Sequence, residues 1–127
     1  MSVFDYLNIS GVPQLSGDMM ALDYFAIMDR ILVKGRHVIR ESTRYFKVYL
    51  PIDYNDIWRR LHDEKKLVDV FIILPAQVEY IDKVFAPERA VVKENERYKI
   101  YLPKKYNSIW EKLDGKAVDL LIVFRRS

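Results

Sequence analysis

Basic and aromatic residues recur together at two places in the chain, and this combination is suited to contact with a nucleic acid. Lys47-Val48-Tyr49 returns as Lys99-Ile100-Tyr101. Lysine and arginine neutralise phosphate charge, and a tyrosine ring stacks on a base. The candidate nucleic-acid-binding residues are Arg40, Arg44, Lys47, Tyr49, Lys93, Arg97, Lys99 and Tyr101. The alternative interpretation is a solvated or partner-facing sheet surface.

The chain lacks the side chains that most catalytic and metal sites need. It has no cysteine, and its two histidines, His37 and His62, have no partner at a catalytic or metal-ligand spacing. Asp69 and Asp119 recur beside an apolar run, where salt bridges explain them more simply than acid chemistry. No glycine-rich phosphate loop or serine-nucleophile motif is present. We therefore predict a protein that is not an enzyme and that needs no cofactor and no metal.

The basic motifs lie inside an internal repeat. The segment YLPIDYNDIW at 49–58 returns as YLPKKYNSIW at 101–110, with seven of ten positions identical at an offset of 52. Such a duplication predicts two similar units related by pseudo-symmetry. We assign 27–75 to repeat unit 1 and 76–127 to repeat unit 2, preceded by an N-terminal arm at 1–26 that could contain a short helix. Neither unit is long enough to bury its apolar face alone, so we expect one shared core in a single domain.

Hydrophobic periodicity predicts the order β-β-β-α-β in each unit. The strands of unit 1 are expected at 27–33, 36–41, 45–50 and 68–74, with a turn at Lys34-Gly35 and a strand end at Pro75. The strands of unit 2 are expected at 80–85, 89–94, 98–102 and 117–124, with a turn at Ala86-Pro87-Glu88. Within 45–50, strict alternation places Phe46 and Val48 toward the core and Lys47 and Tyr49 outward.

Each predicted helix carries one apolar stripe. The stripes are Tyr54-Ile57-Trp58-Leu61 and Tyr106-Ile109-Trp110-Leu113. Their spacing favours burial of the tryptophans in the core over stacking on bases. The predicted fold is α+β, a pseudo-twofold barrel or sandwich of two units with two packed helices.

The charge is distributed unevenly around a net value of +3. Residues 36–74 carry eight Lys or Arg and six Asp or Glu, and 89–127 carry ten and five, whereas the remaining segments sum to −4. Basic repeats favour a polyanionic partner, although an ordinary solvated surface explains them too. No apolar run is long enough to span a membrane, so we expect a cytoplasmic protein without membrane association.

The segment 93–105, Lys-Glu-Asn-Glu-Arg-Tyr-Lys-Ile-Tyr-Leu-Pro-Lys-Lys, resembles the AbrB/SpoVT-type DNA-binding module. The resemblance covers about 35 residues per copy and is weaker in the first copy. It implies a swapped-hairpin barrel, in which two copies interleave their strands, and a role in transcription regulation or as an antitoxin. Glu96 stands where the module has glycine. A related duplicated barrel, the double-psi type, remains an alternative.

Lys104 and Lys105 directly precede the second helix, where a bound anion would offset the unfavourable position of two cations at the helix start. The first copy has Ile52 and Asp53 there, so such a site would exist in one unit only.

From the sequence we expect a small non-enzymatic DNA-binding protein. The alternative is a protein-interaction subunit of a larger assembly, which would use exposed strand faces and the N-terminal arm without touching nucleic acid. The oligomeric state stays open.

Overall fold

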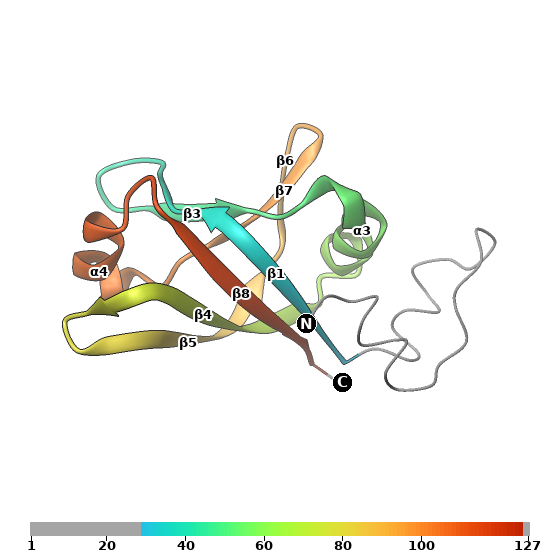
Figure 1. The fold of residues 1–127 in the computed structure, drawn as a ribbon. Helices are drawn as coiled ribbons and strands as arrows, with labels where there is room; N and C mark the ends of the chain where they lie inside the picture. The colour runs from blue at the N-terminus through green and yellow to red at the C-terminus, as the bar shows by residue number, and fades with distance from the viewer. Residues whose placement is uncertain (1–28, 126–127) are drawn as a thin grey trace.

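The computed structural model describes residues 29–125, and within them the chain forms a mixed α+β fold. Eight strands make two four-stranded antiparallel sheets, and two short helices lie at opposite ends of the molecule (Figure 1). The arm predicted at 1–26 lies outside the described residues. No helix in the described part of the chain is long and apolar enough to cross a membrane.

The first sheet has the order β1-β8-β4-β5 and the second the order β2-β3-β7-β6. The strands of the first are β1 (Arg30–His37), β8 (Ala117–Phe124), β4 (Leu67–Val78) and β5 (Ile81–Ala90). Those of the second are β2 (Ile39–Arg40), β3 (Phe46–Tyr49), β7 (Arg97–Tyr101) and β6 (Val92–Glu94). The 3-10 turn η1 (Ile52–Tyr54) precedes α3 (Asn55–Asp63), and η2 (Lys104–Tyr106) precedes α4 (Asn107–Lys112).

The two sheets are joined by single residues at which the chain passes from one sheet to the other. Val38 separates β1 from β2, and Val91 separates β5 from β6. The central pair of each sheet combines one strand from each predicted unit, β4 with β8 and β3 with β7. The amides of Leu50 and Leu102 continue the β3–β7 pairing with 2.9 Å bonds to the carbonyls of Tyr98 and Phe46.

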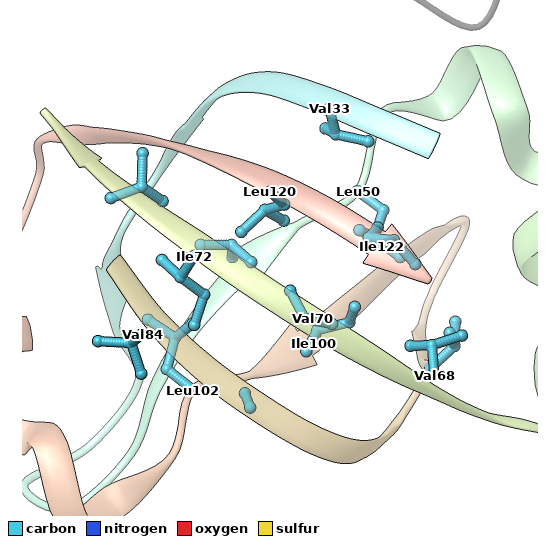
Figure 2. Close-up of a cluster of buried hydrophobic side chains, with 14 of the residues drawn as sticks. Val33, Leu50, Val68, Val70, Ile72, Val84, Ile100, Leu102, Leu120 and Ile122 are labelled. Atoms are coloured by element: carbon cyan, nitrogen blue, oxygen red, sulfur yellow. The ribbon is translucent and has the colours of Figure 1, made fainter. Parts of the chain in front are cut away.

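The core lies between the sheets because alternate residues of the strands point inward. Val70 and Ile72 from β4 and Leu120 and Ile122 from β8 pack toward Ile100 and its neighbours in the second sheet (Figure 2). All the buried apolar residues of the described chain belong to one cluster, which draws on both predicted units. Removing this apolar surface from water is the main favourable contribution to folding.

Both helices bury the apolar stripe that the sequence predicts. Trp58 and Trp110 are fully buried, and each indole N–H donates a 2.8 Å hydrogen bond to the carbonyl of the proline that precedes its helix, Pro51 or Pro103. The proline fixes φ for the first turn, and its carbonyl receives the one polar group that the buried indole carries. The prediction that the tryptophans belong to the core is confirmed.

The predicted turns at Lys34-Gly35 and Ala86-Pro87-Glu88 are wrong, because β1 and β5 run straight through them. Both places are β-bulges, where the register shifts and Gly35 and Glu88 have φ of 68° and 56°. The Gly35 amide donates to Asp119 Oδ1 at 2.9 Å, and the Glu88 amide to Asp69 Oδ1 at 3.0 Å. The recurring aspartates therefore hold the amides that the bulges leave unpaired.

The predicted strand end at Pro75 is also wrong, because β4 continues to Val78. The ladder with β8 ends at Ile73, and the ladder with β5 is irregular between Ile73 and Val78. Proline is tolerated there because no ladder bond needs its missing N–H. The reversal comes later, where Glu79 and Tyr80 both have positive φ, as in the tight turns of hairpins.

We predict that Trp58→Ala and Trp110→Ala each lower the free energy of unfolding by roughly 3–5 kcal/mol, because each removes a fully buried ring and leaves a cavity. Denaturant titration followed by circular dichroism measures the change. The control Tyr80→Ala alters a side chain that is 97% exposed and should stay within about 0.5 kcal/mol of the parent. Similar small effects at all three positions would contradict the packing described above.

Candidate functional site

A charged cluster occupies the outward face of the central β3–β7 pair. Lys47 lies opposite Tyr101, and Tyr49 lies opposite Lys99. Because alternate residues of a strand share a face, all four side chains stand on the side away from the core. The strand alternation predicted this placement, but it did not predict what covers the lysines.

Two carboxylates from the flanking segments bind both lysines. Glu41 follows β2, and Glu94 ends β6. Lys47 Nζ lies 3.1 Å from Oε1 of each glutamate, and Lys99 Nζ lies 2.7 Å from the same two atoms. Each Oε1 therefore bridges two ammonium groups. We name Lys47, Lys99, Glu41 and Glu94 the ionic cluster, and its formal charge is zero.

Tyrosine hydroxyls use the second oxygen of each carboxylate. Tyr101 donates to Glu41 Oε2 at 2.7 Å, and Tyr49 donates to Glu94 Oε2. Both carboxylates are thereby held in place from two sides. Charge-assisted bonds of this kind are stronger than those between neutral groups.

The expectation that Lys47 and Lys99 are open to a phosphate is wrong. They are only 6% and 5% exposed, and their ammonium groups are already paired with carboxylates. A buried charge requires such pairing because desolvation without a partner is strongly unfavourable. The sequence did contain a signal, since Glu41 and Glu94 recur at the same place in both repeats.

The cluster shifts the pKa of its members in opposite directions. Hydrogen bonds, first from Lys99 and then from a tyrosine, lower the pKa of Glu41 and of Glu94 from 4.5 to about 2. Burial by itself lowers the pKa of Lys47 and Lys99, but the hydrogen bonds with the carboxylates and a tyrosine outweigh it, and the pKa of both lysines is raised. All four groups are therefore charged across the neutral pH range.

The other predicted contacts remain at the surface. Arg40 pairs with Glu111 at 3.2 Å, Lys93 is exposed at the edge strand β6, and Arg44 is exposed in the loop before β3. Arg97 is exposed and stands over the ring of Tyr49, with its guanidinium carbon 3.9 Å from the ring centroid.

Near Arg97 lies a second arginine that the sequence analysis did not select. Arg36 is half-buried and donates a 2.8 Å bond to the Tyr49 carbonyl. Its burial and the neighbouring charge of Arg97 both lower its pKa. Arg36 and Arg97 both contact Tyr49, one at its carbonyl and one at its ring. This gathers two positive charges around one residue, where a bound anion would be favourable.

On the other side of the ionic cluster, cations and aromatic rings line a hollow between the sheets. Lys104 Nζ lies 3.0 Å from the Tyr45 hydroxyl and 4.2 Å from its ring centroid, and Tyr45 packs edge-on against Tyr101 at 5.8 Å. The lysine lowers the pKa of Tyr45. We name this hollow the basic groove, and its lining residues are Tyr45, Phe85, Pro87, Arg89, Tyr101, Leu102, Pro103, Lys104 and Lys105.

The basic groove carries three cations and no carboxylate in its lining. Only Tyr101 of the eight predicted residues belongs to it. The sequence predicts an anion site at Lys104 and Lys105 in one unit. Arg89 and Tyr45 lie far from them in the sequence and join the groove only through tertiary structure.

No group of three or more His, Cys, Asp or Glu residues in the described chain is placed to hold a metal ion. The absence of a metal and a cofactor stays a prediction.

We predict that the ionic cluster makes stability depend on acid. Because the pKa of Glu94 is lower in the folded chain than its ordinary value, its contribution to stability is complete above pH 4.5 and disappears as the pH falls toward 2. The destabilisation caused by Glu94→Gln should therefore be largest near neutral pH and shrink across this window. Urea titrations at several pH values measure it. The matched control is Glu96→Gln on the same β6–β7 hairpin, and a pH-independent effect of Glu94→Gln would contradict the prediction.

We also predict that charge balance in the ionic cluster matters more than any single member. Lys47→Met leaves one excess negative charge and Glu41→Gln one excess positive charge, whereas the double variant is neutral. The double variant should therefore be more stable than the sum of the single effects, with a coupling of roughly 0.5–3 kcal/mol. A double-mutant cycle from denaturant titrations measures this coupling, and additive effects would argue against a shared cluster.

No protein family, no curated protein and no solved structure matches this chain. The function of the chain therefore has to be inferred from the geometry of its own residues.

Proposed function

We propose that this protein is a small non-enzymatic DNA-binding protein, with a role such as transcription regulation or that of an antitoxin. We further propose that its two units form one pseudo-twofold, swapped-hairpin barrel similar to the AbrB/SpoVT type. The observation that carries the functional proposal is the pair of cation-and-aromatic sites on either side of the neutral ionic cluster.

The proposed pseudo-twofold barrel is supported by contacts that occur twice, each time from one unit to the other. The side-chain Nδ2 of Asn55 donates to the Glu96 carbonyl at 3.3 Å, and that of Asn107 donates to the Arg44 carbonyl at 3.1 Å. The bonds from bulge amides to Asp119 and Asp69 also cross between units. Two interleaved copies fused into one chain would make such pairs of hydrogen bonds, each running from one copy to the other.

DNA binding is supported by where positive charge remains after the ionic cluster is neutralised. One site is Arg36 and Arg97 beside the ring of Tyr49. The other is the basic groove, in which Arg89, Lys104 and Lys105 surround aromatic rings. The rings of Tyr45 and Phe85 in the basic groove are exposed, whereas Tyr49 in the first site is half-buried. Cations beside aromatic rings suit a polyanion that carries planar bases.

The two sites differ in strength, because the first copy has Ile52 and Asp53 where the second has Lys104 and Lys105. The basic groove should therefore supply more of the phosphate contacts. Lysine and arginine side chains of this kind bind the backbone and give little sequence preference by themselves.

We predict that Lys104→Glu with Lys105→Glu weakens binding to a short DNA duplex by roughly tenfold or more at low salt. The slope of log Kd against log salt should also fall by about 1 for each phosphate that the variant no longer binds. Fluorescence anisotropy over a series of salt concentrations measures both quantities. Arg97→Glu should weaken binding less, because it removes one cation from the weaker site.

The matched control is Arg59→Glu with Arg60→Glu, which makes the same change of charge on α3 at two residues that belong to neither site. Lys99→Glu is not a suitable test, because it would disrupt the ionic cluster rather than a contact with DNA. Failure of the parent protein to bind at low salt, or equal binding by the groove variant and the parent, would overturn the proposal.

A second candidate function, a protein-interaction subunit without nucleic-acid contact, is favoured by one observation. The outer face of the first sheet carries Phe71, Ile73 and Phe85, and the last two are exposed. An exposed apolar face on a sheet commonly marks a contact surface.

A further inference from the structure

The outer face of the first sheet carries an apolar row that crosses all four strands. Leu32 lies opposite Leu121, Leu121 opposite Phe71, and Phe71 opposite Phe85. The rings of Phe71 and Phe85 are 4.8 Å apart, and Ile73 lies next to them along β4. An antiparallel sheet with one face in water normally places polar residues there. This face instead carries an apolar residue on each of its four strands, as a covered face does.

Part of this row forms one wall of an apolar hollow. Phe71, Ile73 and Leu121 line it together with Pro75 and Ala76 from the far end of β4. Phe85 is 47% exposed and Ile73 is 38% exposed. In Figure 1, α3 and α4 lie at the ends of the molecule, so neither helix covers the middle of this sheet.

The segment directly before β1 has the composition that such a face requires. Residues 1–28 contain 17 apolar residues, three aspartates and no lysine or arginine. The segment ends where Asp29 leads into β1, which is an edge strand of this same sheet. The chain therefore enters the sheet at a position from which the preceding residues can fold back over its outer face.

The sequence between Ser16 and Asp29 also has a suitable period and length. Ser16 is a favourable N-cap, and Met19, Leu22 and Phe25 recur at a spacing of three residues. A helix of about 12 residues is about 18 Å long, and four strands span about 14 Å from the first to the last. One such helix is long enough to cover the row from edge to edge.

We propose that residues 16–28 pack on the outer face of the β1-β8-β4-β5 sheet, with Leu22 and Phe25 over the apolar row. The hollow is lined by one acidic and one basic residue, Asp82 and Lys83, so apolar contact rather than charge is what would hold the segment there. A covalently attached segment is present at a high effective concentration, whereas a second copy or another protein pays the full entropy of association. The face is in this proposal an internal contact, which removes the main support for the protein-interaction function.

The absence of cysteine allows a direct test in the full-length protein. Leu22→Cys is combined with Ile73→Cys on the face, a residue outside the basic groove, and the chain is exposed to a mild oxidant. We expect an intramolecular disulfide. The product should run as a monomer on a non-reducing gel, and its intact mass should be lower by two hydrogens. The control pair, Leu22→Cys with Ile52→Cys, places the second thiol on the exposed turn η1 and should cross-link at least roughly tenfold more slowly.

Disulfide-linked dimers as the main product would overturn the proposal in favour of a second copy. Equal cross-linking of the face pair and the control pair would overturn it in favour of a face open to another protein. Neither outcome affects DNA binding through the basic groove, so the two proposals fail separately.

A second measurement avoids cysteine chemistry. Leu22→Asp with Phe25→Asp should uncover the face and increase the fluorescence of a dye that binds apolar surfaces, while circular dichroism shows that the sheets remain. Val3→Asp with Phe4→Asp, outside residues 16–28, should leave the fluorescence unchanged. Unchanged fluorescence in the first variant would contradict the proposed packing.

Discussion

The pairing of two lysines with two glutamates at the centre of the β3–β7 ladder is the interaction on which the second sheet depends. The Oε1 atom of each glutamate binds both Lys47 and Lys99, so the ionic cluster joins the β2–β3 and β6–β7 segments. A slip of one residue in this ladder would turn the lysine of the shifted strand, Lys47 or Lys99, into the apolar core, where nothing would pair it. The cluster therefore helps to specify the register of the strands as well as to cover them.

The neutral centre of this sheet leaves its unpaired positive charge at the two flanks. With two lysines and two glutamates in balance, the charge left over belongs to Arg36 and Arg97 on one side and to Arg89, Lys104 and Lys105 on the other. The two sheets thus present different outer faces. One is polar and flanked by cations beside aromatic rings. The other carries the apolar row, and Phe85 contributes to both the row and the basic groove.

Much of the local structure could be predicted from the sequence, because the patterns that specify it are short. Alternation along Phe46 to Leu50 and the stripe through Trp58 are local consequences of strand and helix geometry, and both were predicted correctly. The bulges at Gly35 and Glu88 were mistaken for turns, because a turn and a bulge both use positive φ. Only the partner aspartate on the neighbouring strand distinguishes them.

The sequence by itself determined the order β-β-β-α-β, which occurs twice along the described residues, together with the buried tryptophans and the side of each strand that avoids the core. The tertiary structure alone decided what each outward side chain meets. Lys99 is five residues from Glu94 but 58 from Glu41, and it binds both at 2.7 Å. Lys104 lies 59 residues from the tyrosine that it contacts. The periodicity of a strand states that a side chain leaves the core. Whether that side chain meets water, a carboxylate or a ring depends on segments brought together by folding, and this is why the lysines predicted to bind DNA were found paired and buried.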